Sequence, residues 1–212
     1  MIHGIRIKVC GLTSLADAVW AHQCGADFLG FIFYPPSPRG TTLTQFRLMH
    51  PSLPAGKTVA VSVSPTVDEL RAFAGAGADF LQVHFPAETP LATVTAWSQA
   101  VGPDKLWLAP KLPPGTDVAA GLLPLAGTFL LDTFHAEKFG GTGATGDWAK
   151  FARHQQAHPE RTWILSGGLN PDNIAAALQA SGAKFVDVNS GVESAPGVKD
   201  PAKVRAFFGR VP

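Results

Sequence analysis

The sequence predicts a single α/β domain over residues 1–212, folded as a (βα)8 barrel with eight parallel strands. A tetrapeptide repeat is the first observation: Gly25-Ala26-Asp27-Phe28 recurs as Gly77-Ala78-Asp79-Phe80 and, with one change, as Gly182-Ala183-Lys184-Phe185. The first two copies begin 52 residues apart and the last two 105, so a unit of about 26 residues fits both spacings. About eight such units fill the chain, as a (βα)8 barrel requires.

The second observation is an alternation of strand-like and helix-like segments. Strand-like apolar runs begin near Ile5, Phe28, Thr58, Phe80, Lys105, Thr128, Thr162 and Phe185. Segments rich in Ala and Leu predict helices at 15–24, 67–76, 91–101 and 173–181. Two weaker helices are expected around 44–50, where the apolar pattern is poor, and around 118–126, which contains Pro124. Such alternation favours βαβ units and a parallel sheet.

The third observation is the position of the glycine-rich turns. A doubly wound open sheet is the alternative fold, and it usually carries a Gly-rich nucleotide-binding turn after its first strand. Here the first strand ends Lys8-Val9-Cys10-Gly11-Leu12-Thr13, which lacks that fingerprint. The Gly-rich turns follow the last three strands instead, and barrels commonly bind phosphate in the loops after strands seven and eight. The glycines therefore favour the barrel.

Composition and charge exclude several classes of protein. The residues are 46% hydrophobic and 16% charged, which is ordinary for a globular protein with a sizeable core. The formal net charge is +1 with no block of Lys and Arg, so no nucleic-acid partner is expected. Two cysteines, Cys10 and Cys24, are too few for a disulfide framework. No signal peptide or membrane span is visible, so we expect a cytoplasmic protein without a membrane partner.

The residues at the strand ends are the candidates for chemistry, because barrel active sites lie there. Cys10 ends strand one, although a free Cys is often only a small buried hydrophobe. Lys8 points to the same side of that strand, and its ammonium would favour the Cys10 thiolate. Asp132 follows an apolar run at the end of strand six, where a carboxylate is costly unless it is paired or functional. Cys24 stands at a helix end and is expected to be structural.

The three glycine-rich turns predict a phosphate site. A backbone cradle for an anion explains turns after three successive strands better than three unrelated loops do. The helix that follows Asn170-Pro171-Asp172-Asn173 would add further N–H groups. The turns are Gly140-Gly141-Thr142-Gly143, Gly167-Gly168 and Ser190-Gly191.

Other polar residues are expected near the same strand ends. Arg39 follows strand two and could hold a carboxylate in a bidentate pair, although a lone Arg is more often solvated. Strand four ends with Gln82 and His84, and strand eight ends with Asp187. No His or acidic residue stands at ligand spacing from His84, so a hydrogen-bonding or core role is favoured over a metal site.

In order along the chain, these motifs resemble the phosphoribosylanthranilate isomerase family of tryptophan biosynthesis, whose members are TIM barrels. The resemblance extends over nearly the full chain, and its motifs are weak singly but highly specific as a series. They are Lys8-Val9-Cys10-Gly11-Leu12-Thr13, Gly30-Phe31-Ile32-Phe33 with Ser37-Pro38-Arg39, Leu131-Asp132-Thr133, Gly140-Gly141-Thr142-Gly143 with Asp147-Trp148, Ser166-Gly167-Gly168-Leu169-Asn170-Pro171, Asp187-Val188-Asn189-Ser190-Gly191-Val192-Glu193 and Pro196-Gly197-Val198-Lys199-Asp200.

The resemblance implies an Amadori rearrangement of N-(5-phosphoribosyl)anthranilate to 1-(2-carboxyphenylamino)-1-deoxyribulose 5-phosphate, with no metal or organic cofactor. Cys10 matches the general base, Asp132 the general acid, and Arg39 the residue that holds the anthranilate carboxylate. The expected phosphate-binding residues are Gly141, Gly167, Gly168, Ser190 and Gly191. Further residues expected to face the sugar-phosphate substrate are Lys8, Gln82, His84 and Asp187.

This mechanism needs a protonated Asp132 and an ionised Cys10. We therefore expect burial to raise the pKa of Asp132 above about 3.9, and a nearby cation to lower that of Cys10 below about 8.5.

The sequence also departs from the family pattern. Strand three reads Val59-Ala60-Val61-Ser62-Val63-Ser64, where the family usually has Gly and an aromatic residue. Phe85-Pro86 follows His84, where Gly is usual. Gly146 replaces an aromatic residue, and Asn189 replaces a more usual Ser. These changes concern the wall near strands three and four and the loop after strand six.

Two alternative functions stay open. A related barrel isomerase of histidine biosynthesis performs the same chemistry, but that group uses carboxylates in both roles, and Cys10 argues against it. A phosphate-binding barrel without catalysis is the other, and the presence of both Cys10 and Asp132 argues against that. Either a monomer or a homodimer fits the sequence.

Overall fold

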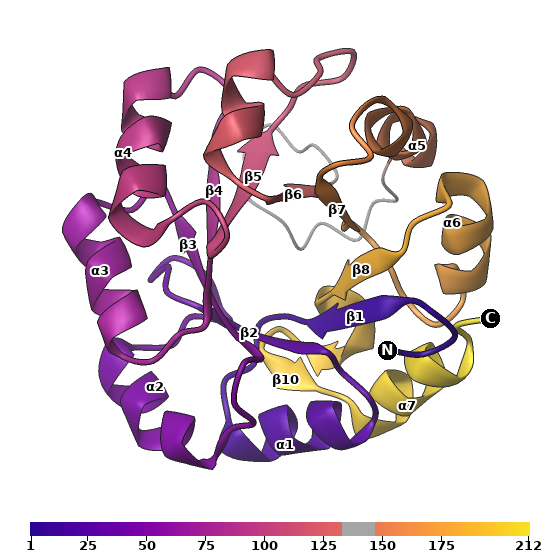
Figure 1. Cartoon of the computed structure of the whole chain (residues 1–212). Helices are drawn as coiled ribbons and strands as arrows, with labels where there is room; N and C mark the ends of the chain where they lie inside the picture. The colour runs from indigo at the N-terminus through magenta and orange to yellow at the C-terminus, as the bar shows by residue number, and fades with distance from the viewer. Residues whose placement is uncertain (133–146) are drawn as a thin grey trace.

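The structure is a computed structural model that describes residues 1–132 and 147–212. Its eight parallel strands close into a barrel in the order β1-β2-β3-β4-β5-β6-β7-β8, and β8 pairs back with β1. Figure 1 shows the helices as an outer ring around these strands. The predicted (βα)8 fold is confirmed.

The elements follow one another around the barrel in chain order. They are β1 Arg6–Val9, α1 Leu15–Gln23, β2 Phe28–Ile32, α2 Leu43–Met49, η1 His50–Ser52, β3 Thr58–Val63, α3 Val67–Gly75, β4 Phe80–Pro86, α4 Leu91–Val101, β5 Leu106–Lys111, η2 Ala120–Leu125, β6 Thr128–Leu131, α5 Trp148–Ala157, β7 Thr162–Leu165, α6 Ile174–Ser181, β8 Phe185–Val188, η3 Ser190–Val192, β9 Glu193–Ala195, β10 Val198–Lys199 and α7 Pro201–Gly209.

The two weakly patterned helices have different outcomes. The segment around 44–50 forms α2, because a capping box stabilises its start: the Gln45 amide donates to Thr42 Oγ1, and the Thr42 amide donates to Gln45 Oε1. The segment around 118–126 forms only η2, a 3₁₀ helix that contains Pro124. Proline removes a backbone donor and clashes with an α-helical turn, so the expected α-helix is absent there.

The repeated Gly-Ala-Asp-Phe motif has a structural role. Asp27 Oδ2 accepts a hydrogen bond of 2.9 Å from the backbone N–H of Ile7, and Asp79 Oδ2 accepts one of 2.8 Å from that of Thr58. Each aspartate therefore stands before an even-numbered strand and binds the start of the strand that precedes it. This explains why the first two copies lie two βα units apart.

A layer of aromatic rings fills the amino-terminal end of the barrel. The Phe28 ring centroid lies 5.5 Å from that of Phe80, 5.1 Å from that of Trp107 and 5.2 Å from that of Phe185. The guanidinium carbon of Arg6 lies 4.6 Å from the Phe185 ring centroid. Because side chains fill this end, a ligand can enter the barrel only from the carboxyl ends of the strands.

After β8 the chain adds an antiparallel hairpin, β9–β10, that the sequence did not predict. The Thr13 hydroxyl donates to the Gly197 carbonyl oxygen in this hairpin at 3.1 Å. A side chain at Gly197, whose φ is +83°, would meet the Pro38 carbonyl oxygen at 2.8 Å. The hairpin thus lies against the loop that carries Arg39.

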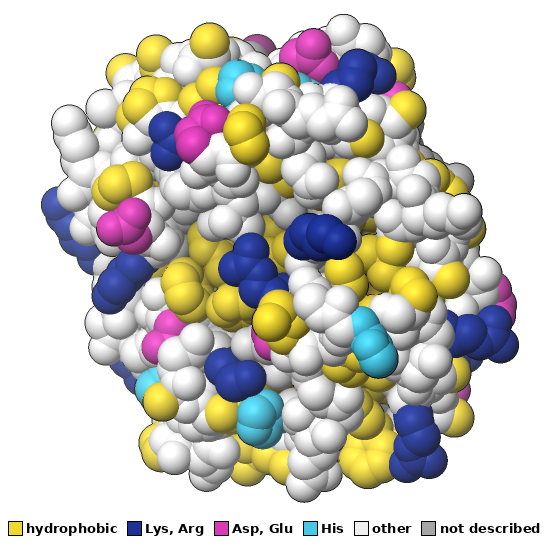
Figure 2. Space-filling view, turned by 45° about the vertical axis from the view of Figure 1, so that its right-hand side comes forward, with side chains coloured by type: hydrophobic (Ala, Val, Ile, Leu, Met, Phe, Trp, Pro, Cys, Tyr) yellow, Lys and Arg dark blue, Asp and Glu magenta, His cyan; other side chains and the backbone are white. Residues whose placement is uncertain are grey.

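Within the described residues, no helix is long and apolar enough to cross a membrane. On the face drawn in Figure 2, Lys and Arg side chains are scattered singly and do not gather into one basic patch.

Candidate active site

A cavity opens at the carboxyl ends of the strands. It brings together most of the residues selected from the sequence. The cavity is lined by Cys10, Ile32, Tyr34, Ser37, Arg39, Val61, Val63, Gln82, His84, Asp132, Ser166, Gly167, Gly168, Leu169, Asp187, Asn189 and Ser190. Lys8 and Gly191 lie outside this lining, and Gly141 falls outside the described residues.

The walls of the cavity differ in character. Ile32, Val61 and Val63 make one part of the lining apolar, and they come from the neighbouring strands β2 and β3. Sequence reasoning did not assign these residues or Tyr34 to the site. The alternation along β3, which places every second residue on the inner face, is the signal that could have found the two valines.

Lys8 lies inside the barrel beneath the cavity. Its side chain is fully buried, and Nζ lies 2.9 Å from Asp187 Oδ1. Burial alone would lower the pKa of Lys8, but Asp187 and Cys10 beside it raise that pKa overall. Burial also pushes the pKa of Asp187 upward, and Lys8 opposes that push. Lys8 therefore stays protonated, and the two groups form a buried ion pair.

Cys10 is buried at the base of the cavity, and its pKa contradicts the expectation from the sequence. Burial raises the pKa of its thiol, while Lys8 and Lys199 lower it and Asp187 raises it further; the net direction is upward. The expected lowering was wrong because Lys8 is already paired with Asp187 and the thiolate would lose its solvation. The resting protein therefore holds Cys10 as a thiol near neutral pH.

His84 is held neutral and in contact with Gln82. Burial, and then the charge of Lys8, lower the pKa of His84 to about 3. Gln82 Nε2 lies 2.8 Å from His84 Nε2, so in this amide orientation Gln82 donates and the His84 proton sits on Nδ1. Gln82 Oε1 is buried without a partner among the described residues. His84 can donate a hydrogen bond here but is a poor base.

The turn after β7 presents backbone N–H groups. Gly167 and Gly168 have φ values of +97° and +63°, which favour glycine. The Gly168 carbonyl oxygen accepts hydrogen bonds from Asn170 Nδ2 at 3.2 Å and Asn173 Nδ2 at 2.9 Å. Among residues 1–132 and 147–212, the N–H groups of Gly167, Gly168 and Ser190 have no acceptor. Such groups at a cavity wall can hold an anion.

The start of α6 contributes differently from the expectation. Asn170 Oδ1 accepts from the backbone N–H of Asp172 at 2.8 Å and from that of Asn173 at 3.2 Å. These two donors are therefore satisfied within the turn. Gly191 has a packing role, because a Cβ there would lie 1.9 Å from the Leu169 carbonyl oxygen. Because position 191 has no side chain, the turn after β8 can lie in contact with the turn after β7.

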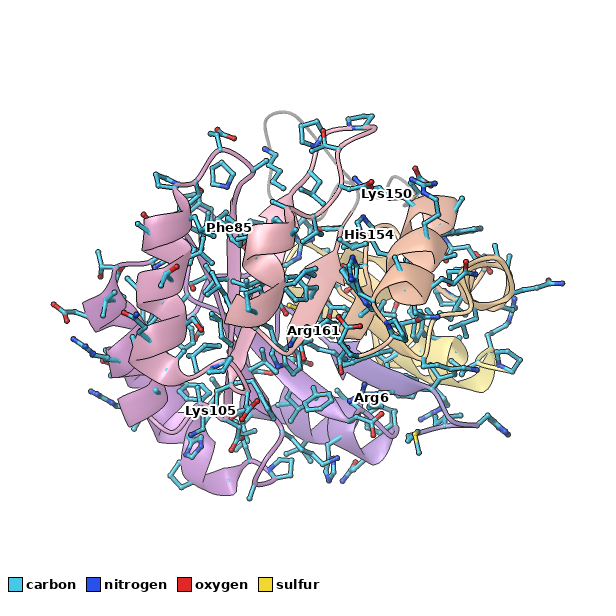
Figure 3. The ribbon with its side chains drawn as sticks, turned by 45° about the horizontal axis from the view of Figure 1, so that its top comes forward. Arg6, Phe85, Lys105, Lys150, His154 and Arg161 are labelled. Carbon is cyan, nitrogen blue, oxygen red and sulfur yellow. The ribbon has the colours of Figure 1, made fainter. Side chains whose placement is uncertain are left out.

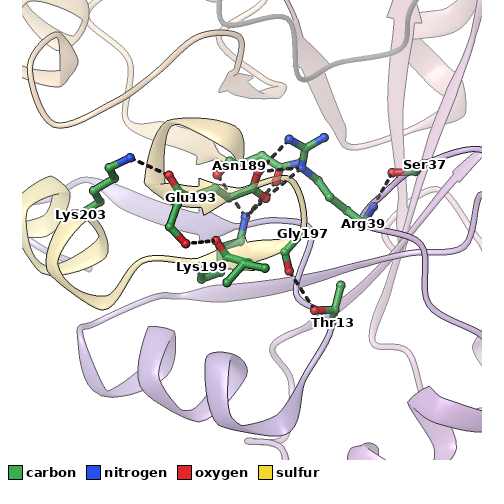
Figure 4. Close-up of polar contacts among 10 residues, drawn as sticks. Thr13, Ser37, Arg39, Asn189, Glu193, Gly197, Lys199 and Lys203 are labelled. Carbon is green, nitrogen blue, oxygen red and sulfur yellow. Dashed lines mark hydrogen bonds and ion pairs between the residues drawn. The ribbon is translucent and has the colours of Figure 1, made fainter.

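Arg39 lines the cavity and pairs with Glu193, at the start of the unexpected hairpin. Its Nε lies 2.9 Å from Glu193 Oε1, and its Nη2 lies 2.7 Å from Oε2. Lys199 Nζ donates to the same Oε1 at 2.9 Å and to Asn189 Oδ1 at 2.9 Å (Figure 4). The sequence motif contained Glu193 and Lys199, but no role was assigned to either.

The departures from the family pattern can now be located. Phe85 lies on the outer side of β4, where its ring centroid is 5.5 Å from that of Trp97 in α4 (Figure 3). It therefore does not line the cavity wall. Asn189 does line the cavity, and Gly146 falls outside the described residues. The described residues contain no group of three or more His, Cys, Asp or Glu side chains that could hold a metal ion.

The chain is similar to known proteins over nearly its full length. Residues 7–210 match the family described as N-(5'phosphoribosyl)anthranilate (PRA) isomerase. An N-(5'-phosphoribosyl)anthranilate isomerase of Magnetococcus marinus is 40% identical over 210 residues, which are 98% of this chain and 95% of that protein.

Solved structures agree with the sequence match. The phosphoribosyl anthranilate isomerase of Thermus thermophilus superposes with a TM-score of 0.80 at 30% identity, over 98% of both chains. An isomerase in complex with reduced 1-(o-carboxyphenylamino)-1-deoxyribulose 5-phosphate gives a TM-score of 0.78 at 29% identity, again over 98% of both. The family match and the relatives therefore identify this chain as a member of the N-(5'-phosphoribosyl)anthranilate isomerase family.

Proposed function

We propose that this protein converts N-(5-phosphoribosyl)anthranilate to 1-(2-carboxyphenylamino)-1-deoxyribulose 5-phosphate, with Cys10 as general base and Asp132 as general acid. Protonated Asp132 donates to the furanose ring oxygen and opens the ring to a Schiff base. The Cys10 thiolate removes the proton from the adjacent sugar carbon, and the resulting enolamine tautomerises to the ketone. Each proton transfer contributes on the order of 10²–10⁴-fold to the rate.

One observation carries the substrate assignment: the cavity has three chemically distinct parts. The N–H groups of Gly167, Gly168 and Ser190 suit a phosphate, and Ile32, Val61 and Val63 suit an aromatic ring. Arg39 supplies a cation for a carboxylate. A substrate with a phosphate at one end and a carboxylated ring at the other matches all three, with Cys10 and Asp132 on the same cavity.

The thiolate needed by this mechanism is a minority form. The active state combines an ionised Cys10 thiol with a protonated Asp132 carboxyl. Because the pKa of Cys10 is raised, only a small fraction of the enzyme molecules is in this state at a given moment. Lys8 stabilises that thiolate, and Asp187 keeps Lys8 in place. Gln82 and His84 face the sugar as neutral hydrogen-bonding groups.

The direct experiment is a fluorescence assay of the purified protein with freshly generated phosphoribosylanthranilate. Cys10→Ser should lower kcat by about 100-fold or more, because a hydroxyl supplies almost no anion near neutral pH. Asp132→Asn keeps the shape but removes the transferable proton, so it should do the same. A Cys10→Ser protein that turns over at the wild-type rate contradicts the assignment.

Two alternatives are tested by the same assay. Activity on the corresponding histidine-pathway intermediate would support the related isomerase, against which the thiol at position 10 argues. Binding of phosphate without turnover would support a non-catalytic barrel.

We also propose one catalytic domain over residues 1–212 that works in the cytoplasm without a cofactor. A solved relative is described as a dimeric isomerase, and chromatography with light scattering would decide between monomer and homodimer here.

A further inference from the structure

Arg39 is held from three sides by other parts of the protein. Its backbone N–H donates to Ser37 Oγ at 3.2 Å, and its side-chain stem passes close to Gly11. A Cβ at Gly11 would lie 2.9 Å from Arg39 Cδ. The Glu193 carboxylate binds the Nε–Nη2 edge of the guanidinium, and the two side chains are only 12% and 4% exposed. This arrangement orders a side chain that would otherwise be flexible.

The geometry leaves one end of the guanidinium for a ligand. Of its five N–H donors, Glu193 engages the one on Nε and one on Nη2. These are the only hydrogen bonds of this guanidinium to the described part of the chain. The Nη1–Nη2 end can still receive a second carboxylate with two parallel hydrogen bonds. Because Arg39 lines the cavity, that end is the one available to a substrate.

Lys199 keeps this cluster positively charged. Its Nζ donates to Glu193 Oε1, and to the backbone oxygen of Asn189 at 3.1 Å as well as to its side chain. Two cations therefore share one carboxylate, and the cluster of Arg39, Glu193 and Lys199 carries a net positive charge. Without Lys199, Glu193 would neutralise Arg39 and weaken its attraction for an anionic ligand.

We propose that Glu193 is a positioning residue for substrate recognition: it fixes Arg39 so that only the Nη1–Nη2 end of the guanidinium meets the carboxylate on the aromatic ring. This inference rests on the proposed function. Glu193 does not line the cavity, and it acts only through Arg39. The hairpin β9–β10, which holds both Glu193 and Lys199, is thus part of the recognition of the carboxylate.

The test compares two competitive inhibitors in the full-length protein. One is reduced 1-(o-carboxyphenylamino)-1-deoxyribulose 5-phosphate, and the other is the same compound with an unsubstituted phenyl ring. The ratio of their inhibition constants reports only on the carboxylate. Glu193→Gln should reduce the wild-type preference for the carboxylated compound by about 10-fold or more, as expected for the loss of a charged hydrogen bond. In an Arg39→Ala background, Glu193→Gln should change the ratio no further.

Lys203→Met is the matched control. Lys203 Nζ donates to the backbone oxygen of Glu193 at 2.7 Å, so its removal loosens the same hairpin without touching the carboxylate. Lys203→Met should leave the ratio of inhibition constants unchanged. If Glu193 only stabilised the hairpin, Lys203→Met and Glu193→Gln would change this ratio to the same extent. If Glu193→Gln does not fold, Glu193→Asp and Arg39→Lys are the substitute test variants, and both should reduce the ratio of inhibition constants.

The outcomes separate this inference from the proposed function. If the wild-type protein fails to bind the carboxylated inhibitor, the proposed function fails. If the wild type prefers the carboxylated inhibitor and the folded Glu193 variants keep that full preference, only the positioning role of Glu193 is overturned. Full preference in Arg39→Lys would overturn it as well, because one ammonium cannot hold both carboxylates in the same geometry.

Discussion

The Cys10 sulfur lies so close to Gly30 of the neighbouring strand β2 that no side chain fits between them. A Cβ at position 30 would be 2.9 Å from Cys10 Sγ and 3.0 Å from Lys8 Cε. Gly30 therefore leaves the space in which the thiol and the ammonium-bearing chain meet. It is a glycine for reasons of packing, since its φ is not in the left-handed region.

Gly30→Ala should displace Cys10 Sγ and lower kcat by about 10-fold or more, because small misplacements of a catalytic group are costly. Steady-state kinetics and thermal unfolding would measure this. Gly75→Ala makes the same change in α3, where nothing lies within 4 Å of the added methyl group, and should leave kcat unchanged. Wild-type kcat in a folded Gly30→Ala protein would mean that the close contact has no role in catalysis.

The charges around Cys10 should control its reactivity with iodoacetamide in opposite directions. Lys8 lowers the pKa of the thiol and Asp187 raises it. In a Cys24→Ser background, where Cys10 is the remaining thiol, Lys8→Met should slow alkylation at pH 8 by about 10-fold or more. Asp187→Asn should accelerate it. Equal rates in both variants would show that neither charge acts on the thiol.

Inorganic phosphate should compete with the substrate, because the N–H groups of Gly167, Gly168 and Ser190 are available at the cavity wall. At fixed ionic strength, millimolar phosphate should raise the apparent KM, and Gly168→Ala should weaken this competition. Gly56→Ala is the control, since Gly56 also has a positive φ (+74°) but nothing within 4 Å of the added methyl group. If phosphate leaves the apparent KM unchanged, these turns do not form the phosphate site.

His84 should make the protein sensitive to acid. The unfolded chain protonates this imidazole near pH 6.5, whereas the folded protein resists protonation down to about 3. Between these values the unfolded state binds more protons, so the free energy of unfolding falls as the pH drops through that window. Because His84 lines the cavity rather than the closed core, we expect a loss of about 1–3 kcal/mol at pH 4, less than full burial would give.

His84→Gln should remove this part of the acid sensitivity. Urea unfolding at pH 7 and pH 4 would give the difference for each protein. His3→Asn, which removes an exposed histidine, should keep the wild-type difference. The prediction is wrong if His84→Gln and the wild type lose the same free energy of unfolding over this range.

The sequence by itself determined the barrel and the place of its chemistry. Strand starts such as Phe28, Thr58 and Phe80 were predicted at the residues where the structure has them, because hydrophobic periodicity and glycine caps are local signals. Cys10 and Asp132 were assigned to one site because parallel strands carry their carboxyl ends to the same face.

The tertiary structure decided what depends on contacts between distant segments. Arg39 and Glu193 are 154 residues apart, and only the folding of the β9–β10 hairpin against the loop after β2 brings their charges together. The direction of the Cys10 pKa shift was also decided there. Lys8 and Cys10 stand two residues apart in the sequence, but burial and the pairing of Lys8 with Asp187 determine how strongly the ammonium acts on the thiol. Desolvation and long-range ion pairs depend on the whole packed structure, and no local pattern encodes them.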